Sequence, residues 1–138
     1  MKLVVDANVF ISALLKNGKT RELLLDEGIE IYAPLFLKEE VIKYKLYIAR
    51  KTGTTTHEVE RFAQELATLA DIKFVDAGKL GAQADIARKI SPDPKDTVYI
   101  ALALAEACPL WSNDGDLKKK QSIIKVITTS EVYELVHK

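Results

Sequence analysis

Short apolar runs alternate with longer amphipathic segments along the chain. The apolar runs are rich in β-branched residues, which is typical of buried strands, and they cover Leu3–Val5, Ile29–Ala33, Ile72–Val75, Leu110–Ser112 and Ile123–Ile127. The segments between them repeat apolar residues every three or four positions, which predicts helices with one buried face. These helices are expected over Val9–Leu15, Arg21–Glu27, Leu35–Arg50, a segment from Thr55 to Leu69, Leu80–Ile90, Lys95–Ala107 and Glu131–His137.

This order of strands and helices predicts an α/β fold. Strands that are separated by helices pair in parallel, and right-handed crossovers place helices on both faces of the sheet. A chain of 138 residues with 48% hydrophobic residues suits a single domain over residues 1–138. In such folds, ligands bind beyond the carboxyl ends of the strands. The residues that follow the predicted strands are therefore the first candidates for a functional site.

Composition excludes several classes of protein. Lys plus Arg and Asp plus Glu both total 20, so the net charge is zero and binding of nucleic acid by bulk positive charge is excluded. One cysteine, Cys108, excludes a disulfide framework and a multi-cysteine zinc site, and it fits a reducing compartment. No apolar run approaches the ~20 residues of a membrane span, and an acid interrupts the N-terminal run too early for a signal peptide. We therefore expect a cytoplasmic protein without a membrane partner.

Acidic residues stand at positions that the predicted fold brings toward one edge of the sheet. Asp6 directly follows the first strand, and Asp114 follows the strand that contains Trp111. Asp96 lies in the first turn of an apolar helix, and Glu40 lies inside the helix after the second strand. Each has a simpler interpretation by itself: a helix cap for Asp6, a dipole partner for Asp96, a turn for Asp114 and a solvated face for Glu40. Their joint placement carries the functional signal.

Converging carboxylates repel one another and need a compensating cation. Mg²⁺ and Mn²⁺ prefer oxygen ligands, and Mg²⁺ is usually held by a few carboxylates together with water and substrate phosphates. A metal held in this way lowers the pKa of bound water and stabilises the charge of a phosphodiester transition state. The acidic set therefore predicts metal-assisted phosphodiester hydrolysis.

Four segments resemble the motifs of the PIN domain family, which are small metal-dependent nucleases that include VapC-type toxins. The segments follow the family's order and cover nearly the whole chain: Leu3–Ser12, Phe36–Val41, Asp93–Ala103 and Trp111–Leu117. The resemblance implies a three-layer, Rossmann-like PIN fold with a central parallel sheet and helices on both faces. It also implies Mg²⁺- or Mn²⁺-dependent cleavage of RNA, less often of DNA. An antitoxin protein and a homodimer are the partners expected from the family.

The family motifs assign roles to individual residues. By position, the metal-binding and catalytic quartet would be Asp6, Glu40, Asp96 and Asp114, and Asp116 would assist at the metal directly or through water. Asn8 and Ser112 would be polar supports that orient the carboxylates or the attacking water.

Two of these positions have a close competitor. Glu39 competes with Glu40, and adjacent helical residues point about 100° apart, so only one of them is expected to face the metal. The neighbouring apolar residues and the family spacing favour Glu40. Asp93 competes with Asp96, and the family pattern favours the acid directly before the Ala-rich helix, Asp96. The choice between Mg²⁺ and Mn²⁺, the number of ions and the RNA target stay open.

Basic and aromatic residues near the glutamate motif allow further contacts with nucleic acid. Cations on or just after that helix can hold phosphates, and tyrosines can stack bases; these residues are Lys43, Lys45, Arg50 and Lys51, and Tyr44, Tyr47 and Tyr99. Solvated surface is the simpler interpretation for any one of the cations, and core or rim packing for the tyrosines. Lys118–Lys120, after the last acidic motif, form a second basic group.

Two other functions compete with an active nuclease. The first is a PIN-type nucleic-acid-binding or scaffold module that has lost turnover. The complete acidic set argues against it, because a binding module gains nothing from carboxylates that repel phosphate. The second is an α/β phosphotransfer domain, such as a receiver or an aspartyl-phosphate hydrolase. Since Asp6-Ala7-Asn8 supplies one carboxylate where such domains need two, this alternative is weak.

Overall fold

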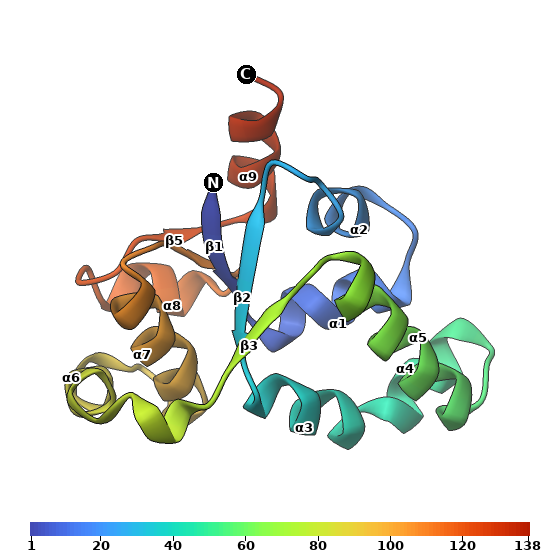
Figure 1. Cartoon of the computed structure of the whole chain (residues 1–138), viewed down its shortest axis with the longest axis horizontal. Coiled ribbons are helices and arrows are strands. Elements are labelled where there is room, and N and C mark those ends of the chain that lie inside the picture. The colour runs from blue at the N-terminus through green and yellow to red at the C-terminus, as the bar shows by residue number, and fades with distance from the viewer.

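The computed structural model describes all residues from Met1 to Lys138. Its centre is a five-stranded sheet in which every neighbouring pair of strands is parallel, with the order β3-β2-β1-β4-β5 (Figure 1). The strands are β1 (Lys2–Val5), β2 (Glu30–Pro34), β3 (Lys73–Val75), β4 (Leu110–Trp111) and β5 (Val126–Ile127). The five strands and the parallel α/β fold predicted from the sequence are confirmed.

Helices connect the strands and close the chain. The α-helices are α1 (Ala7–Leu15), α2 (Lys19–Leu24), α3 (Phe36–Lys43), α4 (Lys45–Thr52), α5 (Thr56–Leu69), α6 (Gly81–Ile90), α7 (Thr97–Glu106), α8 (Gly115–Lys120) and α9 (Thr129–Val136). Two short 3₁₀ turns, η1 (Ala77–Lys79) and η2 (Pro94–Asp96), precede α6 and α7. None of these helices combines the length and the apolar character needed to cross a membrane.

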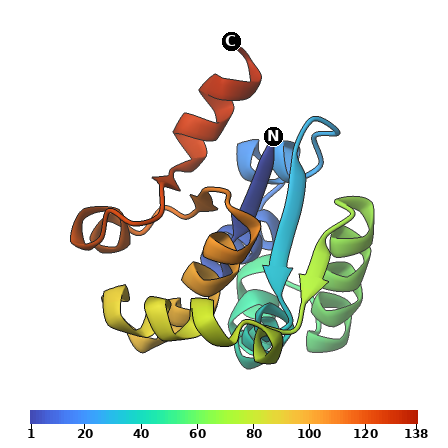
Figure 2. The same cartoon turned by 60° about the vertical axis from the view of Figure 1, so that its left-hand side comes forward.

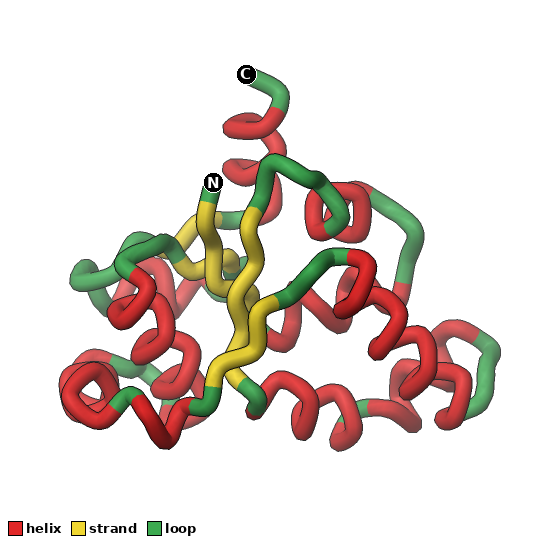
Figure 3. The backbone as a smooth tube through the Cα atoms, in the orientation of Figure 1, coloured by secondary structure: helices red, strands yellow, loops and turns green.

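The helices form layers on the two sides of the sheet. Helix α1 packs against α3, α4 and α5 on one side, while α7 packs against β1 and β2 on the other side and α6 covers α7 (Figure 2). The tube view shows the strands as a central wall between these two groups of helices (Figure 3). This three-layer arrangement agrees with the predicted Rossmann-like architecture.

The core holds the sheet and α7 in fixed positions. Leu3, Val4 and Val5 of β1 are fully buried, as is Trp111 of β4. Five consecutive residues of α7, 99–103, are also buried, as expected for a nearly all-apolar helix between a sheet and a second helix layer. Because this helix is enclosed, the residue at its start, Asp96, is held near the carboxyl edge of the sheet.

Three details differ from the sequence prediction. The helix expected over Leu35–Arg50 is divided at Tyr44, whose φ of −100° and ψ of 8° lie outside the helical range. The strand expected over Ile123–Ile127 contains only its last two residues, because the Ile124 N–H bonds to the side chain of Gln121 instead of a strand. Helix α8 was not predicted; it begins where the side chain of Asp114 caps it.

Candidate active site

Asp6 and Asp114 lie at the carboxyl ends of neighbouring strands. Strand β1 pairs with β4 so that Val5 stands opposite Trp111, and the Asp6 N–H donates to the Trp111 carbonyl at 3.2 Å. Asp6 is the residue after β1, and Asp114 comes three residues after β4. The expectation that both carboxylates start from the same edge of the sheet is therefore confirmed.

Both aspartates also cap a helix. Asp6 Oδ1 accepts the Val9 N–H of α1 at 2.9 Å. Asp114 Oδ1 accepts the Asp116 and Leu117 N–H groups of α8 at 2.9 and 3.3 Å. The simpler interpretation of Asp6 as a cap is thus correct as well. In each case the cap uses Oδ1, so Oδ2 of the same carboxylate remains for a second role.

Ser112 connects the two aspartates. Its side chain is fully buried, and its Oγ accepts the Asp114 N–H at 3.1 Å. The Ser112 side chain also lowers the pKa of Asp6 and thereby favours the charged form of that carboxyl, against the larger effect of burial. This geometry suits the supporting role expected for Ser112. Asn8, the other expected support, is exposed in the first turn of α1.

Glu40 reaches the same region from α3. The Tyr99 hydroxyl donates a hydrogen bond to Glu40 Oε1, and 59 residues separate the two in the chain. Glu40 is partly buried, while Glu39 beside it is exposed. The structure therefore turns Glu40 inward and Glu39 outward.

Tyr99 is the site residue that the sequence interpretation left in the core. It is buried in α7, and its hydroxyl holds Glu40 where the carboxylate faces the other acids. Burial, followed by the bond to Glu40, raises the pKa of Tyr99, so the phenol stays protonated and remains a donor. Its position three residues after Asp96, on the same side of the helix, was the signal that could have identified it.

Asp96 completes the set from the start of α7. It is partly buried at the N-terminal end of α7, where the helix dipole also favours a carboxylate, and its side chain makes no capping bond. Asp93 is exposed and caps the preceding turn by accepting the Lys95 N–H at 2.9 Å. Asp116 is also exposed and lies 3.9 Å from Lys120. The structure thus places Asp6, Glu40, Asp96 and Asp114 where their charges influence one another. Asp114 is exposed like Asp116, but Asp116 lies beside Lys120.

The electrostatics confirm that these side chains interact. The pKa of Asp6 is raised to about 6, chiefly by burial and also by the charges of Asp114 and Glu40. The interactions with Ser112 and the Val9 N–H act in the opposite direction and lower it. Burial also raises the pKa of Asp96 to about 6, with contributions from Asp114, Asp93, Asp6 and Glu40. Four segments distant in sequence therefore place negative charge in one region.

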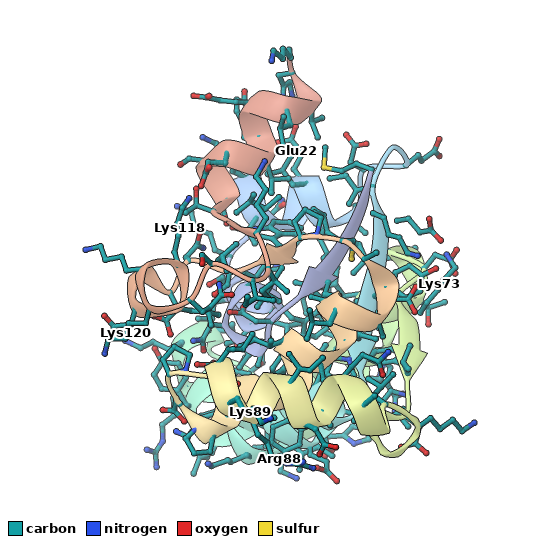
Figure 4. All side chains as sticks on the ribbon, turned by 90° about the vertical axis from the view of Figure 1, so that its left-hand side faces the viewer. Glu22, Lys73, Arg88, Lys89, Lys118 and Lys120 are labelled. Carbon is teal, nitrogen blue, oxygen red and sulfur yellow. The ribbon has the colours of Figure 1, made fainter.

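No basic side chain neutralises this charge. The ion pairs of the structure all lie elsewhere, and none includes any member of the quartet. Two of the three lysines of α8, which Figure 4 labels, are engaged with other acids: Lys118 pairs with Glu131 and Lys120 with Asp116.

The donor set suits a hard divalent cation, although it is not a closed cage. No three Asp, Glu, His or Cys side chains converge tightly enough to enclose an ion by themselves. Mg²⁺ does not require such a cage, because it keeps several waters and is commonly held by one or two carboxylates and by substrate phosphates. The unneutralised carboxylates of Asp6 and Asp114, on adjacent strands, are the natural pair to begin such a site.

The acidic region differs from the groove between α3 and α5. That groove has a volume of about 880 Å³, and its lining includes Leu37, Val41 and Phe74 but no member of the acidic quartet. The polar part of its lining includes Glu60, Thr68 and Asp71, whereas the acids of the quartet come from other positions of the chain. The groove and the acidic region are therefore separate features of the molecule.

A model of the PIN domain family matches residues 4–134. The matched range includes both edge strands of the sheet, β3 and β5, and every acid described above. The chain belongs to the PIN domain family. The resemblance seen in the four sequence segments is thereby confirmed, and the observed layers and parallel sheet are those of this family's fold.

Solved structures support the fold of this PIN domain. It is similar to a chain of the VapBC2 complex from Rickettsia felis, bound to a promoter DNA fragment, with a TM-score of 0.68, 15% identity and coverage of 93% of this chain and 98% of that one. A toxin–antitoxin complex from Klebsiella pneumoniae gives a TM-score of 0.68 at 15% identity, covering 92% and 97%. VapBC-1 from nontypeable Haemophilus influenzae gives 0.65 at 13%, covering 94% and 99%. No curated protein matches the chain.

Proposed function

We propose that this PIN domain is a metal-dependent endoribonuclease that hydrolyses RNA phosphodiester bonds. The observation that carries the proposal is the meeting of Asp6, Glu40, Asp96 and Asp114 in one region without a neutralising Lys or Arg. The desolvated negative charge of Asp6 and Asp96 is costly in a folded protein unless a cation is bound there.

Each residue of the site has a distinct role in this proposal. Asp6 and Asp114 would supply ligand oxygens from the ends of adjacent strands, Glu40 and Asp96 would contribute from α3 and the start of α7, and Asp116 would assist. Ser112 fixes Asp6 relative to Asp114, and Tyr99 fixes Glu40. A bound Mg²⁺ or Mn²⁺ would lower the pKa of water and offset charge on the scissile phosphate. Asn8 is exposed beside Asp6, where it can contact the RNA or the water.

A cleavage assay tests this proposal. Purified protein is incubated with an end-labelled single-stranded RNA in Mg²⁺, in Mn²⁺ and in EDTA. We expect internal cleavage that needs the divalent ion and falls at least 100-fold in Asp6→Asn and Asp114→Asn, because each removes charge opposite the metal. Asparagine is also a good helix cap, so both variants retain their caps. The matched control is Asp71→Asn, an exposed Asp outside the site.

Three results would contradict the nuclease. These are no cleavage with either ion, cleavage that survives in EDTA, or equal activity in Asp6→Asn and the wild type. Calorimetric titration with Mg²⁺ and Mn²⁺ complements the assay by counting the ions. RNA binding without metal binding or turnover would instead favour a binding module.

The structural neighbours suggest the biological context of this activity. Since the neighbouring folds come from toxin–antitoxin complexes, we propose that the chain is the toxin of such a pair, with an antitoxin as protein partner and cytoplasmic RNA as target. Expression of the chain alone should arrest growth, and expression of Asp6→Asn should not. Absence of growth arrest by an active nuclease would refute the toxin role while leaving the nuclease intact. A homodimer stays a prediction, which ultracentrifugation can test.

A further inference from the structure

A basic and aromatic segment follows the inward-facing Glu40. Residues 43–51 contain four cations, two tyrosines and no acid, in a chain whose net charge is zero. The cations are Lys43, Lys45, Arg50 and Lys51. Lys45 pairs with Glu60 of α5, whereas Lys43, Arg50 and Lys51 form no ion pair. Three cations of this segment are therefore not neutralised by an acid of the protein.

The helical spacing aligns this segment with the active site. Glu40, Tyr44, Tyr47 and Lys51 follow one another at intervals of four, three and four residues, which places them within about 60° of one another around a helix axis. Although Tyr44 divides α3 from α4, the backbone bonds continue through it, from Tyr44 N to Glu40 O and from Ile48 N to Tyr44 O. Figure 1 shows α4 continuing from α3 away from the sheet. The row therefore starts at the acidic centre and leads outward.

The two tyrosines of this row are accessible. Tyr44 is 36% exposed and Tyr47 is 50% exposed, although their helices bury other apolar residues such as Ile48. Lys43 Nζ lies 5.5 Å from the centre of the Tyr44 ring, and Lys51 Nζ lies 5.7 Å from the centre of the Tyr47 ring. Cation–π contacts at exposed sites are weak, so a nucleobase can replace each ammonium group on the ring. The displaced lysine would then stand beside the phosphate of that nucleotide.

We propose that Tyr44, Tyr47, Lys43, Arg50 and Lys51 form a track for single-stranded nucleic acid that leads the strand to the carboxylates. This inference rests on the proposed nuclease and adds where its substrate lies and why that substrate is single-stranded. Exposed aromatic rings stack on unpaired bases, and adjacent cations follow the backbone. A duplex hides its base faces and offers the tyrosines nothing to stack on.

The charge of the surface favours nucleic acid over a protein. Protein interfaces are depleted in lysine at their buried centres, whereas each tyrosine of this row has a lysine beside its ring. A protein that covered the row would have to desolvate these ammonium groups. A phosphate backbone would instead meet them at the surface and release counterions.

Binding in EDTA tests the track separately from catalysis. Fluorescence anisotropy of a labelled 12-nucleotide single-stranded RNA is measured with wild type, Tyr47→Leu, Tyr47→Phe and the double variant Tyr44→Leu/Tyr47→Leu. We expect Tyr47→Leu to raise Kd about 10-fold and the double variant to raise it further, because each loses a stacking surface. Phenylalanine keeps the ring, so Tyr47→Phe should stay within about 2-fold of wild type.

Salt dependence tests the cations. Lys51→Gln should lower the slope of log affinity against log salt by about 0.7, the contribution of one phosphate contact on a single strand. The matched control is Lys89→Gln on α6, a lysine outside the track (Figure 4). The same measurements with single-stranded DNA and with duplex RNA compare the possible substrates. The track is supported if the variants lose affinity equally for single-stranded RNA and single-stranded DNA and if duplex RNA binds weakly.

Several outcomes overturn it. Wild-type affinity in Tyr47→Leu and the double variant, an unchanged salt slope in Lys51→Gln, or tighter binding of duplex would each do so. So would a dimer in ultracentrifugation that Tyr47→Leu dissociates while RNA affinity stays unchanged. Circular dichroism must show that each variant is folded. Cleavage that persists with no effect of the tyrosines on binding refutes only the track, whereas weakened binding without cleavage by the wild type refutes only the nuclease.

Discussion

Two polar regions lie near the same edge of the sheet and differ in how their charges are balanced. The first is the acidic quartet at the ends of β1 and β4. The second, which we call the paired region, lies between α8, β5 and α9 and includes Lys118, Gln121, Thr128 and Glu131. In the paired region, Glu131 bonds to Lys118 and to the N–H and hydroxyl of Thr128. In the quartet, no carboxylate meets a cation.

The pKa values of acidic residues shift in opposite directions in the two regions. The bond from Lys118, together with that from the Thr128 N–H, lowers the pKa of Glu131 to about 2. Burial and neighbouring acids raise the pKa values of Asp6 and Asp96 to about 6. Charge in the paired region thus favours the fold, whereas charge in the quartet opposes it. A protein tolerates such a cost where function requires it, so breaking each region should affect different properties.

The largest effect is expected from Glu40. We predict that Glu40→Gln lowers the cleavage rate at least 100-fold, because it removes one of the inward-facing charges. Glu39→Gln is the matched control, since Glu39 is exposed on the next residue of the same helix, and its activity should stay within about 3-fold of wild type. Tyr99→Phe should lower the cleavage rate about 10-fold, an intermediate effect, because it removes the hydrogen bond that positions Glu40 but leaves the Glu40 charge in place. Equal losses in Glu39→Gln and Glu40→Gln would contradict the inward assignment of Glu40.

In the paired region the largest effect should come from Gln121. This buried side chain donates to the carbonyls of Leu117 and Ile124 and accepts the Ile124 N–H, at 3.0 to 3.2 Å. Gln121→Ala leaves these backbone groups without partners, and we expect a loss of about 2–3 kcal/mol in the free energy of unfolding in urea. The exposed Gln64→Ala is the control and should change it by less than about 0.5 kcal/mol. A loss below 0.5 kcal/mol in Gln121→Ala would show that the region is not held by these bonds.

The sequence was sufficient to predict the parallel fold, whereas the roles of Asp6, Glu40, Asp96 and Asp114 at a metal stay a prediction. Strand runs such as Leu3–Val5 have a strong pattern, and the residue that follows a parallel strand must lie at the sheet edge. The spacing of Tyr99 from Asp96 indicates only that both lie on one side of the helix, and the bond to Glu40, a partner 59 residues away, needs the three-dimensional structure. The division at Tyr44 also gives no apolar signal, since the spacing of Val41 and Ile48 runs through it. Local patterns predict elements, whereas contacts between elements need the three-dimensional structure.

Asp6 connects function and stability. Its pKa of about 6 in the folded protein is above its ordinary value of 3.8, so the native state binds the proton more tightly and stability falls as pH rises from about 4 to 6. Asparagine carries no charge and still caps α1. In metal-free buffer at pH 7.5, Asp6→Asn should therefore be more stable than wild type by about 1–2 kcal/mol, a value reduced from the full pKa shift because the group is only partly buried.

Thermal unfolding as a function of pH checks this prediction. The advantage of Asp6→Asn should disappear by about pH 4, where the wild-type carboxyl is protonated, and should shrink when Mg²⁺ or Mn²⁺ stabilises the wild type. Asp116→Asn, at an exposed position, should show no advantage at any pH. A variant less stable than wild type at pH 7.5 would mean that the Asp6 charge supports the fold.

The smallest effect is expected from the ion pair between Lys118 and Glu131. Both side chains are about two-fifths exposed, so water screens the pair, and Lys118→Gln should cost only about 0.5 kcal/mol in urea unfolding. Glu131 keeps its bonds to Thr128 in this variant, which isolates the ion pair from the capping box of α9. The cost should vanish in 1 M NaCl. It should also fade as pH drops below about 4 toward 2, because the lowered pKa of Glu131 means that its stabilising charge is lost only in acid. This pH dependence has the opposite sign to that of Asp6; the same sign in both regions would contradict the contrast between them.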